Sequence, residues 1–289
     1  MNFTTYLQQK HYRPGTIKTY RRHRDYYLAW AEKSGREAEK ITYTDLLDFI
    51  KHCRRKGQKK AYINQLLGVV RHYYEYLKHS KKITVNPATG LYIRGRLRRL
   101  PHDLLAAEQL DTIYTGYQEG GITGSRNKAM LGLFVYQGIT PFELHHLEPG
   151  HLQLKSGKIE IPPTTRSRSR VLNLEACQMI ELQEYLSITR EKILSETGKN
   201  TSKLFTSLGS GHRIHTIISK LREQLGRQHN FFTGTAQLRQ SRIAIWARQY
   251  DIRKAQYLAG HKYVSSTERY RQEDLEELTG QLEKYHPLK

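Results

Sequence analysis

The chain has 289 residues with two cysteines, and no run approaches the ~18 apolar residues of a membrane span. A disulfide framework, a zinc site built on cysteines, a secretion signal and a membrane anchor are therefore not expected, and the cytoplasm is the expected setting. The net charge of +21, from 48 Lys and Arg against 27 Asp and Glu, favours a polyanionic partner.

The positive charge is concentrated at the front of the chain. Residues 1–100 carry 23 Lys or Arg and 7 Asp or Glu, a net charge of +16, whereas the remaining 189 residues have a net charge of +5. Charge added only for solubility does not explain such a surplus. The first third of the chain is therefore predicted to bind nucleic acid.

A small bundle of four helices is expected over residues 1–90. Pro14 begins one amphipathic segment, and Gly35 ends it. Thr42 and Asp45 have the spacing of a capping box at the start of the next. The clearest helix is 58–79, where apolar residues recur at helical spacing.

A basic connector is predicted over 91–103, between this bundle and a second domain at 104–289. Its arginines suit an extended chain lying along a phosphate backbone, and the alternative is a solvated linker. Charge alone selects the candidate DNA-binding residues Arg21, Arg22, Lys59, Lys60, Arg94, Arg96, Arg98 and Arg99.

The second domain is expected to be mainly helical around a small antiparallel β-sheet. The strands are predicted at 152–154, 158–161 and 171–174. The helices are predicted at 107–118, 126–137, 142–147, 175–194, 214–226, 237–249 and 252–258. An acidic, amphipathic helix is predicted at 272–285. The fold class is therefore mainly α with a small antiparallel sheet.

Candidate chemistry lies in the segment 238–270. Arg239 stands near the start of a predicted helix, His261 follows the glycine that ends another, and Tyr270 comes nine residues later. Arginine, histidine and tyrosine together suit phosphoryl transfer by a tyrosine nucleophile, because the arginine neutralises phosphate charge and the imidazole assists the oxygens. With 20 Tyr and 14 His in the chain, the spacing alone is a weak signal.

This segment resembles the C-terminal signature of the tyrosine recombinases, or phage integrases. Leu238-Arg239-Gln240-Ser241, Ala244, Leu258-Ala259-Gly260-His261 and Tyr270 are in register with it. Further matches are Leu100-Pro101 with Leu104-Leu105 and Glu108-Gln109-Leu110, Gly138-Ile139-Thr140 with Glu143-Leu144, and Arg170-Val171-Leu172-Asn173-Leu174. The resemblance implies an N-terminal four-helix core-binding domain followed by a mixed α/β catalytic domain.

The chain departs from the family pattern at three positions. Thr140 stands where the family has its first catalytic arginine, and Ala236 stands where it has a histidine. The lysine that the family carries on its β-hairpin would fall near Thr164–Thr165, where this chain has no lysine. Candidate compensating residues are Arg166, Arg168, His145, His146 and Arg242, and Lys262 could share the role of His261.

The resemblance implies a DNA site-specific recombinase, from a bacterium or a mobile element, in which Tyr270 attacks a DNA phosphate with Arg239 and His261 assisting. No metal or other cofactor, no membrane and no small-molecule substrate is expected. The partners implied are double-stranded DNA and further copies of the chain, which form a tetramer through the helix 272–285. The alternative for that helix is packing on its own domain. Two alternatives remain: a recombinase-fold DNA-binding regulator that has lost the chemistry, and an unrelated helical DNA- or RNA-binding regulator in which Tyr270 is a core residue.

Overall fold

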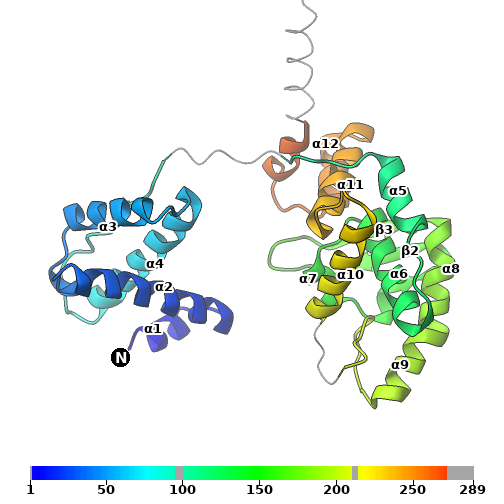
Figure 1. Cartoon of the computed structure of the whole chain (residues 1–289), viewed down its shortest axis with the longest axis horizontal. Helices are drawn as coiled ribbons and strands as arrows, with labels where there is room; N and C mark the ends of the chain where they lie inside the picture. Colours follow the sequence, from blue (N-terminus) through cyan, green and yellow to red (C-terminus); the bar gives the residue numbers. More distant parts are fainter. Residues whose placement is uncertain (1, 95–100, 210–213, 272–289) are drawn as a thin grey trace, which may run out of the picture. The chain divides into compact units, whose positions relative to one another are not determined.

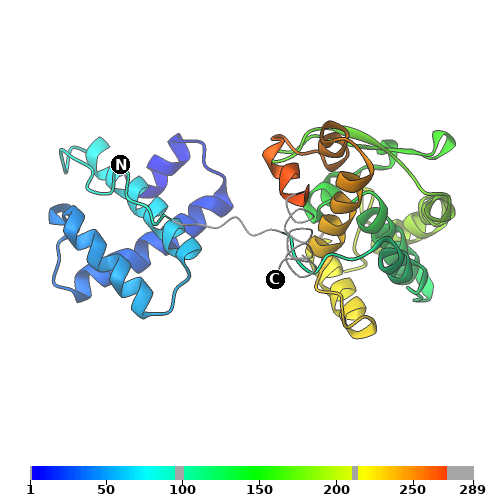
Figure 2. The same ribbon diagram turned by 90° about the horizontal axis from the view of Figure 1, so that it is seen from above.

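The computed structural model describes residues 2–94, 101–209 and 214–271, which form two compact units within Met1–Arg98 and Arg99–Lys289 (Figures 1 and 2). The prediction of a mainly helical chain with a small antiparallel sheet is confirmed. Residues 95–100 of the predicted connector, which include Arg96, Arg98 and Arg99, lie outside the described residues, as does the predicted helix 272–285.

The first unit is a bundle of helices joined by short turns. Its elements are α1 (Phe3–Gln9), α2 (Pro14–Lys33), the 3-10 turn η1 (Ala38–Lys40), α3 (Tyr43–Arg55) and α4 (Lys60–His79). The predicted capping box is confirmed, because the Asp45 carboxylate accepts from the Thr42 amide at 2.9 Å and the Thr42 hydroxyl accepts from the Asp45 amide.

An aromatic core holds α2, α3 and α4 together. Tyr27 and Trp30 of α2 pack on Phe49 of α3 with ring centroids 5.1 and 5.0 Å away. The Tyr27 and Tyr74 hydroxyls lie 2.6 Å apart, and the Tyr74 hydroxyl donates to the Ala38 carbonyl at 3.0 Å. Tyr27 is therefore the donor to Tyr74, and both buried hydroxyls are hydrogen-bonded.

The second unit surrounds the buried helix α6, whose residues are covered on almost every side. Its helices before the sheet are α5 (Ala107–Thr115), α6 (Gly121–Tyr136), α7 (Pro141–His146) and the 3-10 turn η2 (Pro149–His151). Those after the sheet are α8 (Ala176–Glu184), η4 (Tyr185–Thr189), α9 (Arg190–Thr197), α10 (Ile214–Gln228), α11 (Thr235–Gln249) and α12 (Ile252–Ala259). Helices α5, α8, α9 and α11 all pack against α6.

The sheet is small and antiparallel, with strand order β1-β2-β3. Its strands are β1 (Leu152–Gln153), β2 (Lys158–Ile161) and β3 (Arg170–Asn173), with the 3-10 turn η3 (Leu154–Ser156) between the first two. Ile161 pairs with Arg170 at the end where the loop 162–169 leaves the sheet. Alternate residues of β3 face the core, so Arg170 and Leu172 are buried.

The helix predicted over 175–194 is interrupted. A π-helical turn, η4, separates α8 from α9, and the three run on from one another on the outer side of α6 (Figure 1). Tyr185 at this turn donates from its hydroxyl to the Leu204 carbonyl at 2.8 Å, and Thr189 bonds Ser125 of α6 at 2.8 Å. These tertiary contacts accompany the wider turn, which helical periodicity does not encode. None of the described helices is long and apolar enough to cross a bilayer.

Candidate active site

Arg239 links two loops at the start of α11. Its Nη1 donates to the Gly138 carbonyl, in the turn before α7, and its Nη2 donates to the Ala259 carbonyl at 2.7 Å, at the end of α12. The side chain is 15% exposed. Burial is the main cause that lowers the pKa of Arg239, and the nearby Arg170 adds to this while Glu143 and Tyr270 oppose it. The guanidinium of Arg239 is thus held in place by two carbonyls and remains partly accessible to solvent.

His261 follows the glycine that ends α12. Gly260 has a φ of +66°, the left-handed conformation of a helix C-cap, as its position in the sequence predicts. The His261 Nδ1 lies 2.8 Å from the hydroxyl of the buried Thr267. Burial, followed by the charges of Arg239, Arg269 and Arg170, lowers the pKa of His261 to about 4. The ring is therefore neutral at physiological pH.

Tyr270 lies in the helical stretch 265–271 and is only 6% exposed. Its ring lies nearly parallel to that of His261, with centroids 6.3 Å apart and planes 20° apart. It belongs to a buried apolar cluster that includes Ile243 and Ala247 of α11 and Ala259 of α12. The structure therefore brings Tyr270, His261 and Arg239 together in one place from three separate elements.

A buried carboxylate stands beside these groups. Glu143 of α7 is 1% exposed, its Oε2 accepts from the Thr140 amide at 2.8 Å and hydroxyl at 2.9 Å, and the same oxygen lies 3.8 Å from Arg239 Nη1. Its Oε1 accepts from Arg170 Nη1 at 2.6 Å. Burial alone would raise the pKa of Glu143, but the hydrogen bond and charge of Arg170, the charge of Arg239 and the Thr140 amide outweigh it and lower the pKa to about 2. Glu143 is therefore an anion at every physiological pH.

The three positions that depart from the family pattern hold no cation. Thr140 caps α7 with its hydroxyl, which also accepts from the Glu143 amide at 3.1 Å. Ala236 and Thr165 are both exposed. These side chains carry no charge, so the positive charge they would contribute in the family must come from elsewhere or be absent.

The candidate compensating residues take other positions. Arg242 turns away, since its Nε donates to the Val135 carbonyl at 2.8 Å and its guanidinium lies 5.5 Å from the Tyr136 ring. Arg166 and Arg168 have exposed side chains, although the backbone amide of Arg168 donates to the Gly260 carbonyl at 2.9 Å. His146 Nδ1 lies 2.7 Å from the Phe142 carbonyl.

His145 is half-buried in the same helix as His146, with the two rings perpendicular. Lys262 has an exposed side chain.

Sequence reasoning missed Arg170 as a site residue. Its side chain is fully buried against Glu143, and its charge acts on both Arg239 and His261. The available signal was an arginine at a core-facing position of a strand, which calls for a buried carboxylate partner. The sequence does not say which carboxylate that is.

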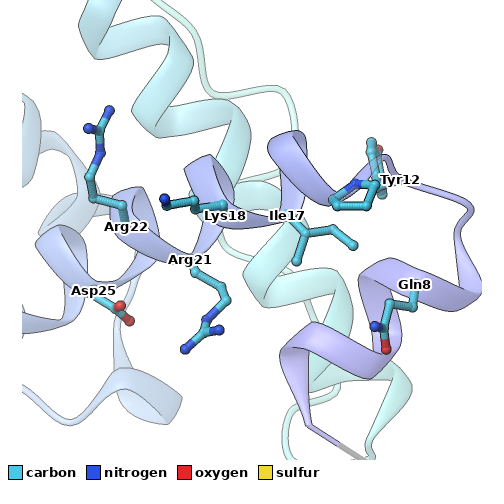
Figure 3. A pocket seen from close by; sticks show the side chains of 8 residues that line it. Gln8, Tyr12, Ile17, Lys18, Arg21, Arg22 and Asp25 are labelled. Atoms are coloured by element: carbon cyan, nitrogen blue, oxygen red, sulfur yellow. The ribbon is translucent and has the colours of Figure 1, made fainter. Parts of the chain in front are cut away.

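The charge-selected DNA-binding residues of the first unit are exposed. Arg21, Arg22, Lys59 and Lys60 all have exposed side chains, as does Arg94 after α4. Lys18, Arg21 and Arg22 line a hollow of about 720 Å³ on this unit. Figure 3 shows Arg21 and Arg22 projecting from α2 in different directions. Such basic side chains suit phosphate contacts, and their role stays a prediction.

The described residues contain no group of three or more His, Cys, Asp or Glu side chains placed to hold a metal ion.

Comparison with known families covers most of the chain. Residues 1–81 match the family model described as "Phage integrase, N-terminal SAM-like domain", and residues 103–277 match the "Phage integrase family" model. The second match contains Glu143, Arg170, Arg239, His261 and Tyr270.

Curated relatives and solved structures agree with these models. The chain is 27% identical to tyrosine recombinase XerC of Pelotomaculum thermopropionicum, over 99% of this chain and 97% of the relative. It is 24% identical to XerC of Oceanobacillus iheyensis, over 99% and 94%.

Among solved structures, a XerH recombinase bound to palindromic difH substrate in a post-cleavage complex matches with a TM-score of 0.75 and 18% identity, over 91% of this chain and 78% of that one. A lambda integrase dimer bound to a COC′ core site matches with a TM-score of 0.63 and 15% identity, over 93% and 92%. At these identities the structures show a shared fold.

Proposed function

Because the chain belongs to the phage integrase family of tyrosine recombinases, we propose that it is a DNA site-specific recombinase whose nucleophile is Tyr270. The observation that carries the proposal is the grouping of Tyr270 with His261 and Arg239, which come from three separate elements. Arginine, imidazole and phenol at one place are what attack on a phosphodiester requires.

The reaction balances with these side chains alone. The Tyr270 oxygen forms a bond to phosphorus while the bond from phosphorus to the 5′-oxygen breaks, which gives a 3′-phosphotyrosyl link and a free 5′-hydroxyl. Neutral His261 takes the proton of the phenol and, once protonated, returns a proton to the leaving 5′-oxygen, so that atoms and protons balance. Arg239 holds the non-bridging oxygens, where negative charge is greatest.

His261 acts as a neutral imidazole. Because its pKa is lowered to about 4, it accepts a proton or a hydrogen bond at neutral pH and contributes no positive charge. Its Nδ1 is next to Thr267, so Nε2 is the nitrogen assigned to the reaction.

The exposed basic side chains of the first unit, Arg21, Arg22, Lys59 and Lys60, bind the phosphate backbone of the DNA without reading bases.

We further propose that four copies assemble on two DNA sites, through the acidic segment 272–285, in the cytoplasm of a bacterial or mobile-element host. The acidic composition of this segment in a basic chain supports a docking role. Segment 272–285 lies outside the described residues.

Covalent capture tests the proposal. Duplexes bound by the chain are selected from a random-sequence pool and resynthesised with a single nick at successive positions, so that the cleaved strand diffuses away. Wild type is expected to give a DNA adduct that survives detergent, and Tyr270→Phe to give none while still binding DNA. Tyr263→Phe is the matched control, because Tyr263 lies in the same segment but is 72% exposed.

Long incubations are needed, because loss of one preorganised donor slows such reactions by about 10²–10³-fold. The absence of an adduct from every bound duplex would favour the alternative, a recombinase-fold DNA-binding regulator. The departures at Thr140 and Ala236 are the observations in favour of that alternative.

A further inference from the structure

Arg170 is a buried cation, and some of its hydrogen-bond donors are unsatisfied. Its side chain is 0% exposed, and its Nη1 donates to Glu143 Oε1 at 2.6 Å. Within the described residues, its Nε and Nη2 have no hydrogen-bond acceptor. Burying a guanidinium with donors unsatisfied is costly, so a structural role alone is a poor explanation for an arginine here.

The arginine lies beside Gly260, the residue that precedes His261 of the candidate active site. A Cβ atom added to Gly260 would stand 2.5 Å from Arg170 Nη1, and the next residue is His261. The neighbouring residue pair Ser167 and His261 forms an isolated β-bridge, which fixes the loop before β3 against the histidine. Arg170 is therefore held within reach of the groups proposed to act on the phosphate.

The negative charge of Glu143 offsets the positive charge with which the site would bind a phosphate. Its Oε2 lies 3.8 Å from Arg239 Nη1, close enough for the carboxylate to neutralise this partly exposed guanidinium. The family pattern places a further arginine at position 140, where this chain has threonine. With that arginine gone, something else must offset the carboxylate.

We propose that Arg170 is a positioning residue which neutralises Glu143 and so leaves the charge of Arg239 free for the scissile phosphate. The proposal rests on the proposed recombinase function. With Arg170 present, two guanidinium groups face one carboxylate, and the site keeps a net positive charge. Without it, Glu143 pairs with Arg239 and cancels the charge of that guanidinium.

Cleavage of a matched pair of substrates tests this role. Arg170→Met is expected to slow cleavage by about 10²–10³-fold on the ordinary phosphodiester, the usual effect of losing one charge-stabilising donor. On a duplex with a methylphosphonate at the scissile position, which lacks the negative charge, most of that loss is expected to disappear. An equal loss on both substrates, or no loss on either, would overturn the proposal.

Two further variants guard against misfolding. Arg170→Lys keeps the charge, and its cleavage rate is expected to stay within about tenfold of the wild-type rate. The double variant Glu143→Gln with Arg170→Met removes both charges and is expected to recover most of the cleavage lost in Arg170→Met. Failure of both variants to exceed Arg170→Met would also refute the role.

Ionisation of His261 gives a readout that needs no DNA. The charged groups acting on His261 are Arg239 of α11, Arg269 of the stretch 265–271, Arg170 of β3 and Glu143 of α7. In Arg170→Met the pKa of His261, followed by NMR, is expected to rise from about 4 toward its usual 6.5, because one of the cations that lower it is lost and Glu143 offsets the charge of another, Arg239, while burial still holds it below 6.5. The double variant is expected to return it close to the wild-type value.

Arg126→Met is the matched control. Arg126 is also buried, at 5% exposure in α6, but its guanidinium bonds Asn127 and the Thr206 carbonyl. It is expected to leave the His261 ionisation unchanged. If wild type forms no adduct on any duplex, the proposed function fails, and the NMR titration still decides this inference: an unchanged His261 pKa in Arg170→Met overturns it.

Discussion

Removal of Glu143 from its buried pair with Arg170 should strongly destabilise the second unit, because it leaves a buried charge without a partner. In Glu143→Ala the guanidinium of Arg170 keeps its charge but loses its partner, and the Thr140 amide and hydroxyl lose their acceptor. Removing one partner of a buried pair costs about 3–5 kcal/mol. The pKa of Glu143 gives a similar figure, because a drop from its usual 4.5 to about 2 corresponds to about 3 kcal/mol.

Urea unfolding of the intact chain, followed by circular dichroism, measures this effect. A loss of about 3–4 kcal/mol moves the midpoint by about 1.5–2 M for a slope of about 2 kcal/mol per M. Glu148→Ala is the matched control, because Glu148 is 42% exposed and bonds Lys203 at 3.0 Å, a surface pair worth about 0–1 kcal/mol. An unfolding free energy for Glu143→Ala within 1 kcal/mol of that control would refute the reasoning.

The same comparison has a pH dependence of known sign. A carboxyl whose pKa is lower in the folded state stabilises the fold above its unfolded pKa, and this stabilisation is lost as the pH falls through the folded value. The difference between wild type and Glu143→Ala should therefore be constant near neutrality and shrink between pH 4.5 and about 2. A difference that grew over this range would contradict the assigned ionisation.

Three further predictions concern other parts of the chain. Tyr74→Phe should destabilise the first unit by about 1–3 kcal/mol in urea unfolding, and more than Tyr27→Phe, because it leaves both the Tyr27 hydroxyl and the Ala38 carbonyl unpaired; equal effects would contradict the assigned donors. Wild type should lose stability as the pH falls from 6.5 to about 4, because His261 binds a proton more readily when unfolded, and His261→Gln should reduce this loss. The same pH dependence of the unfolding free energy in both proteins would disprove this. Arg21→Gln should weaken DNA binding for all sequences and reduce the salt slope by about 1, and a changed sequence preference in a binding titration would show base contact instead.

Local patterns in the sequence predict most of the helices. The spacing of apolar residues locates α4, and the Thr42–Asp45 pair locates the start of α3, because both signals are contained within a few residues. The π-helical turn η4 was missed, since its contacts are with Ser125 and Leu204, which are distant in sequence.

The residues of the candidate site also fall into two groups, those that the sequence selects and those that only the fold reveals. Arg239, His261 and Tyr270 fall in register with the family signature that the segment 238–270 resembles, so the resemblance selects them together. Arg170 joins them only through Glu143, which lies 27 residues earlier in the chain, and only folding of β3 beside α7 makes that contact. Arg242 carries the right charge one turn beyond Arg239, but its guanidinium caps the end of α6 instead. Charge and spacing nominate residues, and only the packing shows where each side chain points.

The most direct measurement is the identity of the residue linked to DNA. Wild-type chain is incubated with the selected nicked duplexes, the detergent-stable adduct is digested with protease, and the peptide attached to the DNA is sequenced by mass spectrometry. The account predicts a peptide carrying Tyr270 joined to a 3′-phosphate, with the 5′-hydroxyl released. A link at any other residue, or DNA bound with no covalent link at all, would contradict it.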